Sequence, residues 1–410
     1  MSSSTSSSEA AYAPPSRAVY VKILLAITVG MAVAMAIIRL FTFLNDVSGD
    51  TILGRVLEAR AALPQILAEE KDLVMFYGSS MVQAGFSARQ FDRQMAERGV
   101  EVKAFNFGFG GLNPYFQDYL ARRIREAFEA GDRRLELAML EFNPFQTTTA
   151  RWQGALPVVD SFVVMLASPN ELWEITRREP ARGIRMLNIH YLRDDISAEM
   201  ITWHFGGSLR PPRPRSNLPE DEEISKRLDE LGPEFGKRLE EDYPDYADED
   251  WYYPWQGAGT IPEERSESTR EVYREYYELL RNQRFLENDE LNRITCCDIE
   301  ELHFKETLIA AYIRIVQTFQ QFSDRVEVIL LPRNTAWIEY SQEAAERLQG
   351  VLDRIRDETG VVIKDWQVTD RITPEMFSDT THLSRYAGDV EFTEMLVEEY
   401  APLLAGRGDG

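Results

Sequence analysis

Short apolar runs alternate with longer segments of helical periodicity along most of the chain. The apolar runs are Leu73–Tyr77, Val102–Phe107, Leu135–Phe142, Val326–Leu331 and Val361–Trp366. Helical patterns accompany them at 86–98, 115–130, 304–322, 341–358 and 383–404. Short apolar strands that alternate with helices are typical of parallel βαβ units whose sheet is covered on both faces. The pattern therefore predicts an α/β fold, a three-layer α/β/α domain with a parallel five-stranded sheet.

The N-terminal region has a different pattern. A Ser-rich leader at 1–16 is predicted to be disordered, and Ile23–Ile38 then runs for sixteen residues without a charge. Crossing a bilayer takes about 20 apolar residues. Residues 17–44 are long enough if Lys22 and Arg39 extend their charges to the two interfaces. We therefore expect a transmembrane anchor at 17–44, with a buried globular helix as the alternative.

The charges around this span predict its topology. Arg17 and Lys22 precede it, whereas Asp46 and Asp50 follow it. This bias predicts a cytoplasmic N-terminus and a single-pass membrane protein whose body lies on the exported side, periplasmic or extracellular. Ala34-Met35-Ala36 resembles a signal-peptidase site, but the apolar run continues past it, which favours an uncleaved signal-anchor.

The same patterns divide the chain into consecutive parts. Ala, Leu and Glu in 45–70 predict a linker helix, and the alternation of strands and helices occupies 71–149 and 304–410. Residues 150–303 interrupt it, and a connection of this length between strands predicts an insertion that forms a subdomain or lid. Within the insertion, the aromatic cluster Trp251–Trp255 is either a sugar-stacking platform or a small core that pins the insertion down.

Charge excludes one class of partner. The 410 residues carry a formal net charge of −23, and residues 219–250 alone hold 14 acidic and 4 basic side chains. That acidic run predicts a solvated or partly disordered face. Binding to a phosphate backbone needs clustered Lys and Arg, so the charge argues against a nucleic-acid partner.

The cysteines and most histidines suggest no further site. Cys296 and Cys297 are adjacent, and neighbours in sequence close no useful loop. They predict no disulfide framework and leave the compartment open. His190, His204 and His303 have no ligand-like spacing to one another or to carboxylate pairs. We expect no metal site and no cofactor.

Four polar or glycine-rich segments follow predicted strands or precede the last predicted helix. They are Gly78-Ser79-Ser80, Asn106–Gly111, Glu141–Pro144 and Asp379–His382. Catalytic groups of open parallel sheets gather where the strands end at their carboxyl edge. We therefore expect these segments to form one pocket.

The residue types in these segments suit acyl chemistry. In a Ser-His-Asp relay, His accepts the Ser proton while Asp orients the imidazole and stabilises its cation. Ser80, His382 and Asp379 supply that set, and the chain has only four histidines. A glycine-rich loop near Gly111 and the amide of Asn143 could donate N–H groups to a developing oxyanion, each typically worth about 2.7–4 kcal/mol of barrier.

Together, the four segments resemble the SGNH (GDSL-like) hydrolase superfamily, whose blocks contribute Ser, Gly, Asn and His in this chain order. The resemblance covers about 71–145 and 326–405 and implies a flavodoxin-like strand order. It implies five roles: the nucleophile for Ser80, the oxyanion hole for Gly111 and Asn143, the base for His382, and its orienting acid for Asp379.

The chain departs from the family pattern at three positions. Ser79 stands where the family usually has Asp, and Glu141 and Pro144 replace the Gly and Asp around Asn143. A Gly-Ser-Ser first block with a membrane anchor is similar to the cell-envelope branch. That branch includes the alginate O-acetylation proteins and the D-alanyl-lipoteichoic acid protein.

The resemblance implies a serine-dependent acyl-ester hydrolase or O-acyltransferase, of acetyl type, acting on cell-envelope or exported polysaccharide. The triad does not distinguish transfer to water from transfer to a sugar hydroxyl. Two alternatives stay open: a non-catalytic scaffold or accessory subunit that partners a membrane-bound O-acyltransferase, and a lipid-directed esterase.

Each site residue also has an ordinary structural explanation. Ser80 could be a helix N-cap, and Asp379 could cap the helix predicted to follow it. Gly111 could serve only a turn, and Asn143 could simply end a strand. His382 could be a surface or capping residue.

Overall fold

Five parallel strands form the centre of the molecule, a computed structural model that describes residues 16–45, 52–193, 222–242, 267–385 and 387–406. The strands are β1 (Asp72–Ser79), β2 (Val102–Phe109), β3 (Leu135–Glu141), β4 (Val326–Leu330) and β5 (Val362–Asp365). They pair in the order β2-β1-β3-β4-β5, and every pairing is parallel. The predicted five-stranded parallel sheet with flavodoxin-like order is confirmed.

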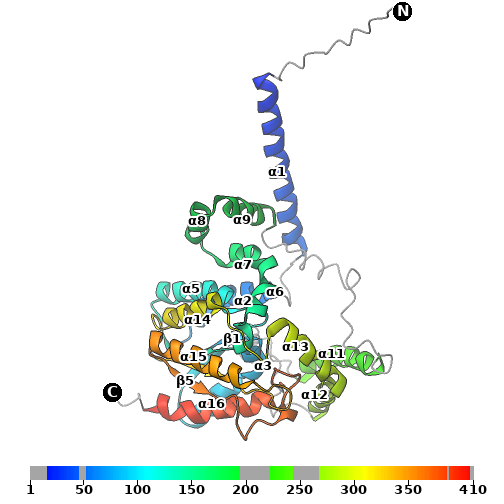
Figure 1. Ribbon diagram of the computed structural model, residues 1–410, viewed down its shortest axis with the longest axis vertical. Helices are drawn as coiled ribbons and strands as arrows, with labels where there is room; N and C mark the ends of the chain where they lie inside the picture. Colours follow the sequence, from blue (N-terminus) through cyan, green and yellow to red (C-terminus); the bar gives the residue numbers. More distant parts are fainter. Residues whose placement is uncertain (1–15, 46–51, 194–221, 243–266, 386, 407–410) are drawn as a thin grey trace, which may run out of the picture.

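Helices cover both faces of this sheet (Figure 1). On one face α5 (Pro114–Ala130) packs against α14 (Glu306–Phe319), which also contacts α15 (Gln342–Thr359). On the other face α4 (Ala88–Glu97) packs against α16 (Gly388–Ala405). The central strands are buried along almost their whole length. This burial on both faces explains why their sequences are apolar without alternation.

The C-terminal helix begins later than the sequence predicted. The pattern indicated a helix over 383–404, but α16 begins at Gly388. The preceding residues form a turn in which Phe377 and Leu383 pair as an isolated antiparallel bridge. Leu383 is apolar because the turn buries it, and not because it starts a helix.

Strand β2 holds the short helix α3 (Ser80–Gly85) that follows β1. The Asn106 side-chain amide donates to the carbonyls of Val82 at 3.0 Å and Phe86 at 2.7 Å. A Cβ on Gly108 would overlap the backbone of α3, so only glycine permits this approach. The middle and the end of α3 are therefore fixed against the sheet.

Helix α2 (Ile52–Leu67), which the sequence suggested as a linker, packs against α5 and β2. Its Arg55 reaches the end of β2, where Nε donates to the Gly108 carbonyl at 2.6 Å and Nη2 donates to the Asn106 carbonyl at 3.1 Å. Ala59 and Ile66 are fully buried. This helix is thus part of the packed body.

The insertion leaves and re-enters the sheet domain at one place. Thr148 and Phe304 pair as an antiparallel bridge, and the Lys305 N–H donates to the Thr147 carbonyl at 2.8 Å. Its longer helices are α6 (Thr149–Ala155), α7 (Val159–Leu166), α8 (Pro169–Arg178), α9 (Pro180–Arg193), α11 (Glu222–Asp242), α12 (Glu267–Leu280) and α13 (Gln283–Cys297). The aromatic cluster Trp251–Trp255 lies outside the described residues.

The two cysteines lie at the end of α13. Cys296 and Cys297 are joined as a disulfide between sequence neighbours. The sequence predicted no disulfide framework, and this bond connects no second segment of the chain.

Helix α1 (Arg17–Asn45) projects away from the body (Figure 1). Its window Arg17–Ala34 has 18 residues, a mean hydropathy of 1.8 and no buried share. The predicted apolar N-terminal helix is therefore present, and it is consistent with a signal anchor or a signal sequence. The leader at 1–15 lies outside the described residues.

Candidate active site

Ser80 lies at the junction of β1 and α3. The strand ends at Ser79, whose side-chain oxygen accepts the Met81 N–H at 3.2 Å. Ser79 is therefore the cap of α3, the ordinary role that Ser80 could have had. Ser80 is the first residue of the helix and is only partly buried.

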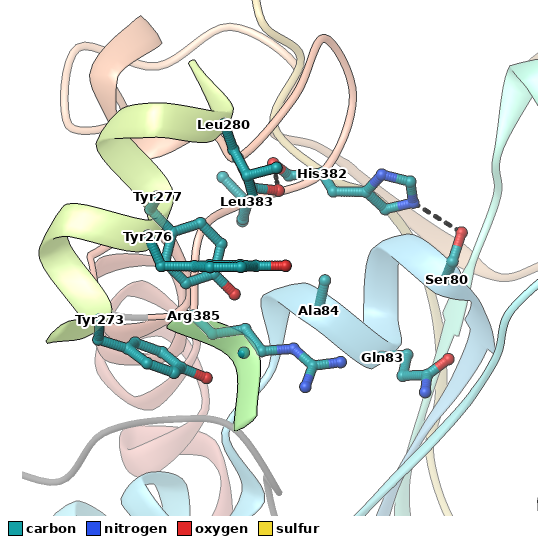
Figure 2. A pocket seen from close by; sticks show the side chains of 12 residues that line it. Ser80, Gln83, Ala84, Tyr273, Tyr276, Tyr277, Leu280, His382, Leu383 and Arg385 are labelled. Carbon is teal, nitrogen blue, oxygen red and sulfur yellow. Dashed lines mark hydrogen bonds between the residues drawn. The ribbon is translucent and has the colours of Figure 1, made fainter. Parts of the chain in front are cut away.

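Ser80, His382 and Asp379 form a continuous chain of hydrogen bonds. Ser80 Oγ lies 2.8 Å from His382 Nε2, a contact that Figure 2 shows. His382 Nδ1 lies 2.7 Å from Asp379 Oδ2. With its proton on Nδ1, the imidazole donates to the carboxylate and leaves Nε2 to accept the Ser80 proton. The structure brings the three residues together, and their catalytic role stays a prediction.

The turn that carries His382 also fixes Asp379. Asp379 Oδ1 accepts the N–H groups of Thr381 and His382, both at 2.7 Å. Burial raises the pKa of Asp379, but the charge and hydrogen bonds of His382 and the charge of Arg293 outweigh it. Together they hold the pKa well below its usual range. Asp379 is therefore ionised at neutral pH, the state that stabilises an imidazolium.

Helix α13 of the insertion contacts the same turn. Arg293 Nη2 lies 3.3 Å from Asp379 Oδ2, and Arg293 Nε lies 3.1 Å from Asp289 Oδ1. Asp289 Oδ2 in turn accepts the Thr380 N–H at 3.3 Å and also the Thr380 hydroxyl. This contact was not predictable from the sequence, because Asp289 and Arg293 have the i,i+4 spacing of an ordinary surface ion pair.

Replacing Arg293 by glutamine should lower turnover. Arg293 contacts the Asp379 carboxylate, and its charge helps to hold the pKa of Asp379 below its usual range. Without this charge the carboxylate that orients His382 is less firmly held, so we expect kcat to fall by about tenfold, which corresponds to about 1.4 kcal/mol. Arg293→Lys keeps the charge and should retain most of the activity. An unchanged kcat in folded Arg293→Gln would show that Arg293 does not support the carboxylate.

A buried carboxyl from the next strand lies behind the nucleophile. Glu141, at the end of β3, accepts the Ser79 N–H and, at 3.0 Å, the Ser79 hydroxyl. A Cβ on Gly78 would overlap the Glu141 side chain, so glycine permits this contact. A buried carboxyl therefore lies directly against Ser79, the residue that precedes Ser80.

Burial raises the pKa of Glu141 to about 7, although hydrogen bonds from Ser79 and Asn143 and the charge of His382 favour the carboxylate. The folded chain therefore binds this proton more tightly than the unfolded chain, whose ordinary value is 4.5. The contribution of this bound proton to the stability of the folded state is fully present below pH 4.5. It is lost as the pH rises through about 7.

We expect Glu141→Gln to abolish this pH dependence. Between pH 4.5 and 8 the wild type should lose about 3 kcal/mol of unfolding free energy relative to the variant. Denaturant midpoints of the full chain in detergent, taken across this range, measure the difference. Glu346→Gln, at an exposed position, is the control. A constant difference between wild type and Glu141→Gln would mean that Glu141 does not titrate as described.

Asn143 follows β3 and lies behind the same residues. Its Nδ2 donates to Ser79 Oγ at 3.0 Å and contacts Met81 Sδ at 3.2 Å. Its Oδ1 accepts the Phe145 N–H at 2.9 Å and so caps a short turn after the strand. In this structure the amide is thus directed at the residue before Ser80.

The glycine-rich loop after β2 lies beside the nucleophile. A Cβ built on Gly110 would lie 3.5 Å from the Ser80 Cβ. Gly111 has a φ of 78°, a conformation that favours glycine. Its carbonyl accepts a hydrogen bond from Arg151 of α6 at 2.9 Å. A second insertion helix therefore also holds a loop of the site.

A cavity of about 460 Å³ opens in front of Ser80 and His382. One wall is the tyrosine-rich face of α12, and the other walls come from α3 and the His382 turn (Figure 2). The Tyr276 hydroxyl and the Arg385 guanidinium both point into this space. Tyr273 and Tyr277 behind it are buried. The sequence suggested an aromatic platform at Trp251–Trp255, which lies earlier in the insertion. It did not indicate these tyrosines, because their spacing is that of any amphipathic helix.

Of the other three histidines, only the side chain of His303 lies within the described part of the chain. It lies beside Asp298, with Nδ1 at 3.0 Å from Oδ2. In the part of the chain that the structure describes, no cluster of three or more His, Cys, Asp or Glu could hold a metal ion.

No family model matches the chain, and no curated protein matches it.

Proposed function

We propose that the protein is a serine-dependent acyl-ester hydrolase or O-acyltransferase of the SGNH type. One observation carries the proposal. The Ser80 hydroxyl, the His382 imidazole and the Asp379 carboxylate are linked in series at 2.8 Å and 2.7 Å, at the edge of an accessible cavity. Such a relay makes a hydroxyl nucleophilic at neutral pH.

The first half-reaction transfers an acyl group to the enzyme. His382 Nε2 takes the Ser80 proton as Oγ forms a bond to the ester carbonyl carbon, which gives a tetrahedral oxyanion. The oxyanion collapses, the ester C–O bond breaks, and the departing alkoxide takes the proton from His382. Asp379 stays ionised and stabilises the imidazolium between these two proton transfers.

The oxyanion needs donors on the side of Ser80 that faces the glycine-rich loop. The backbone N–H groups of Ser80 and Gly111 are the proposed donors, and the Asn143 amide is the third. Asn143 can serve only if it turns from Ser79 towards the substrate, a change that substrate binding would have to induce. Catalytic hydrogen bonds in free enzymes are often looser than those in the substrate complex.

The second half-reaction decides between hydrolysis and transfer. Water, or a hydroxyl held in the cavity, loses its proton to His382 and attacks the acyl carbon, and the bond to Ser80 Oγ breaks as the serine regains its proton. Tyr276 and its neighbours give the cavity a wall of aromatic faces and hydroxyls, which suits a sugar ring. Cell-envelope or exported polysaccharide is therefore the proposed substrate class.

The proposed location follows from α1. As an uncleaved anchor, this helix would keep the enzyme at a membrane, with the body on the exported side. The charges Arg17 and Lys22 before the span support that orientation. A membrane-bound O-acyltransferase is the proposed partner in the transferase case.

A second candidate function rests on Asn143. Because its amide is bonded to Ser79, a chain that never releases it would lack one oxyanion donor and could act as a non-catalytic scaffold. A fluorophosphonate probe separates the two functions. The full-length protein in detergent should be labelled on Ser80, as mapped by mass spectrometry, if the serine is activated. Folded protein that resists labelling would support the scaffold.

Product analysis then distinguishes the two enzymes. The protein is incubated with an acetyl-ester donor and an oligosaccharide, and free acetate and acetylated sugar are measured. A transferase gives mainly acetylated sugar, and a hydrolase gives acetate at a rate that the oligosaccharide does not change.

A further inference from the structure

Helices α8 and α9 form a hairpin beside the anchor helix. Helix α8 packs on α9, α9 packs on α7, and α9 also contacts α1. The hairpin lies next to the end of α1 that is nearer the body, away from the sheet (Figure 1). If α1 crosses a membrane, the hairpin therefore lies at the surface of that membrane.

The hairpin exposes large apolar side chains. Trp173 of α8 is 65% exposed, and Ile184 and Leu187 of α9 are 67% and 45% exposed. Ile184 and Leu187 are three residues apart and so share one helix face. Leu156 and Val158, just before α7, are also exposed. Apart from α1, the described part of the chain has nine exposed large apolar side chains, and these five are more than half of them.

Basic side chains accompany this apolar surface. Pro169–Arg193 contains five arginines and three glutamates in a chain of net charge −23. The side chains of Arg177, Arg178 and Arg185 are 66%, 77% and 69% exposed, although Glu174 and Asp160 lie within ion-pair distance of them. Exposed apolar groups flanked by arginine are typical of helices that lie in a membrane interface and attract anionic headgroups.

The hairpin is tied to the body by ion pairs. Glu171 of α8 bonds to Arg122 and, at 3.1 Å, to Arg123 of α5. Arg182 of α9 bonds to Asp160 of α7 at 2.8 Å. The surface that the hairpin presents is therefore fixed relative to the sheet and to the cavity.

We propose that the α8–α9 hairpin is a second membrane contact, which inserts Trp173, Ile184 and Leu187 into the interface of the bilayer that α1 crosses and binds anionic lipid through its arginines. Its continuity with α1 and its local positive charge select a lipid surface over a protein partner or a second copy of the chain. The contact is independent of the acyl chemistry. It holds the body close to the membrane, where α1 alone would only tether it.

Tryptophan quenching by brominated lipid tests this contact. The full-length protein is placed at one copy per nanodisc, in phosphatidylcholine and phosphatidylglycerol with or without brominated acyl chains. The chain has seven tryptophans, so lipid contact of Trp173 should account for up to about one-seventh of the emission. Trp173→Phe should lose that quenched fraction, and Trp337→Phe, a change in the loop after β4, should keep it.

The quenching results distinguish a lipid surface from a protein partner or a second copy of the chain at the hairpin. Equal quenching of wild type and Trp173→Phe would show that Trp173 does not touch lipid, and would overturn the proposal in favour of a protein partner or self-association. Arg177→Glu/Arg178→Glu should reduce the Trp173 quenching in anionic discs and leave it nearly unchanged in pure phosphatidylcholine. Equal quenching of this variant and wild type in anionic discs would overturn the anionic-lipid part. Thermal unfolding of each variant confirms that it is folded.

Discussion

Replacing Ser80 by alanine is expected to lower turnover of p-nitrophenyl acetate by about 10⁴- to 10⁶-fold, the range seen when the nucleophile of a Ser-His-Asp enzyme is removed. Without Oγ no acyl-enzyme can form, and His382 has no hydroxyl to deprotonate. The loss should appear in kcat. The oxyanion donors and the cavity keep their positions, so KM should change little.

The matched control is another serine-to-alanine change away from the cavity. Ser341 caps α15, where its side chain accepts the Ala344 N–H at 3.1 Å. Ser341→Ala should lose about 1 kcal/mol of stability and keep its activity. Full turnover in folded Ser80→Ala would reject Ser80 as the nucleophile and, with it, the proposed chemistry.

The second large effect is expected from Asp379→Asn, with a loss of about 10⁴-fold in kcat. The asparagine oxygen can still accept the N–H groups of Thr381 and His382, so the turn should keep its shape. Its NH₂ group, however, would face His382 Nδ1 and force that nitrogen to act as an acceptor. The proton then moves to Nε2, which can no longer accept the Ser80 proton.

Two measurements check this explanation. The rate of fluorophosphonate labelling should fall in parallel with turnover, because both depend on the activated serine. Thermal unfolding should show a folded variant. If folded Asp379→Asn keeps its activity within about tenfold, the carboxylate does not orient the base, and Asp379 would be a turn residue alone.

The fold was predictable because its central strands are buried on both faces. A run such as Leu73–Tyr77 contains no charged residue and no alternation of polar and apolar residues, which is typical of a strand in a covered parallel sheet. The start of α16 was not predictable in the same way. Leu383 is apolar because a turn buries it, and a pattern of apolar residues does not separate a turn from a helix start.

The site was predictable only where the residue type itself limits the chemistry. The relay was indicated because the chain has only four histidines and because Ser80 follows the first strand directly. Glu141 was noticed only as a departure from a family pattern, and its contact with Ser79 depends on the register of two neighbouring strands. Arg293 and Tyr276 lie on amphipathic helices, and charged or aromatic residues in such helices are usually surface or packing groups.

The contact between α13 and the His382 turn has a consequence for local unfolding of the protein. Asp289 and Arg293 connect the insertion to the residues around Asp379, so the two should open and close as one cooperative unit. Fraying of α13 would remove the Arg293 and Asp289 contacts from the turn that holds His382 and Asp379, while the sheet stays intact. We therefore expect a version trimmed to the central sheet and its covering helices to hold this turn less firmly than the whole protein does.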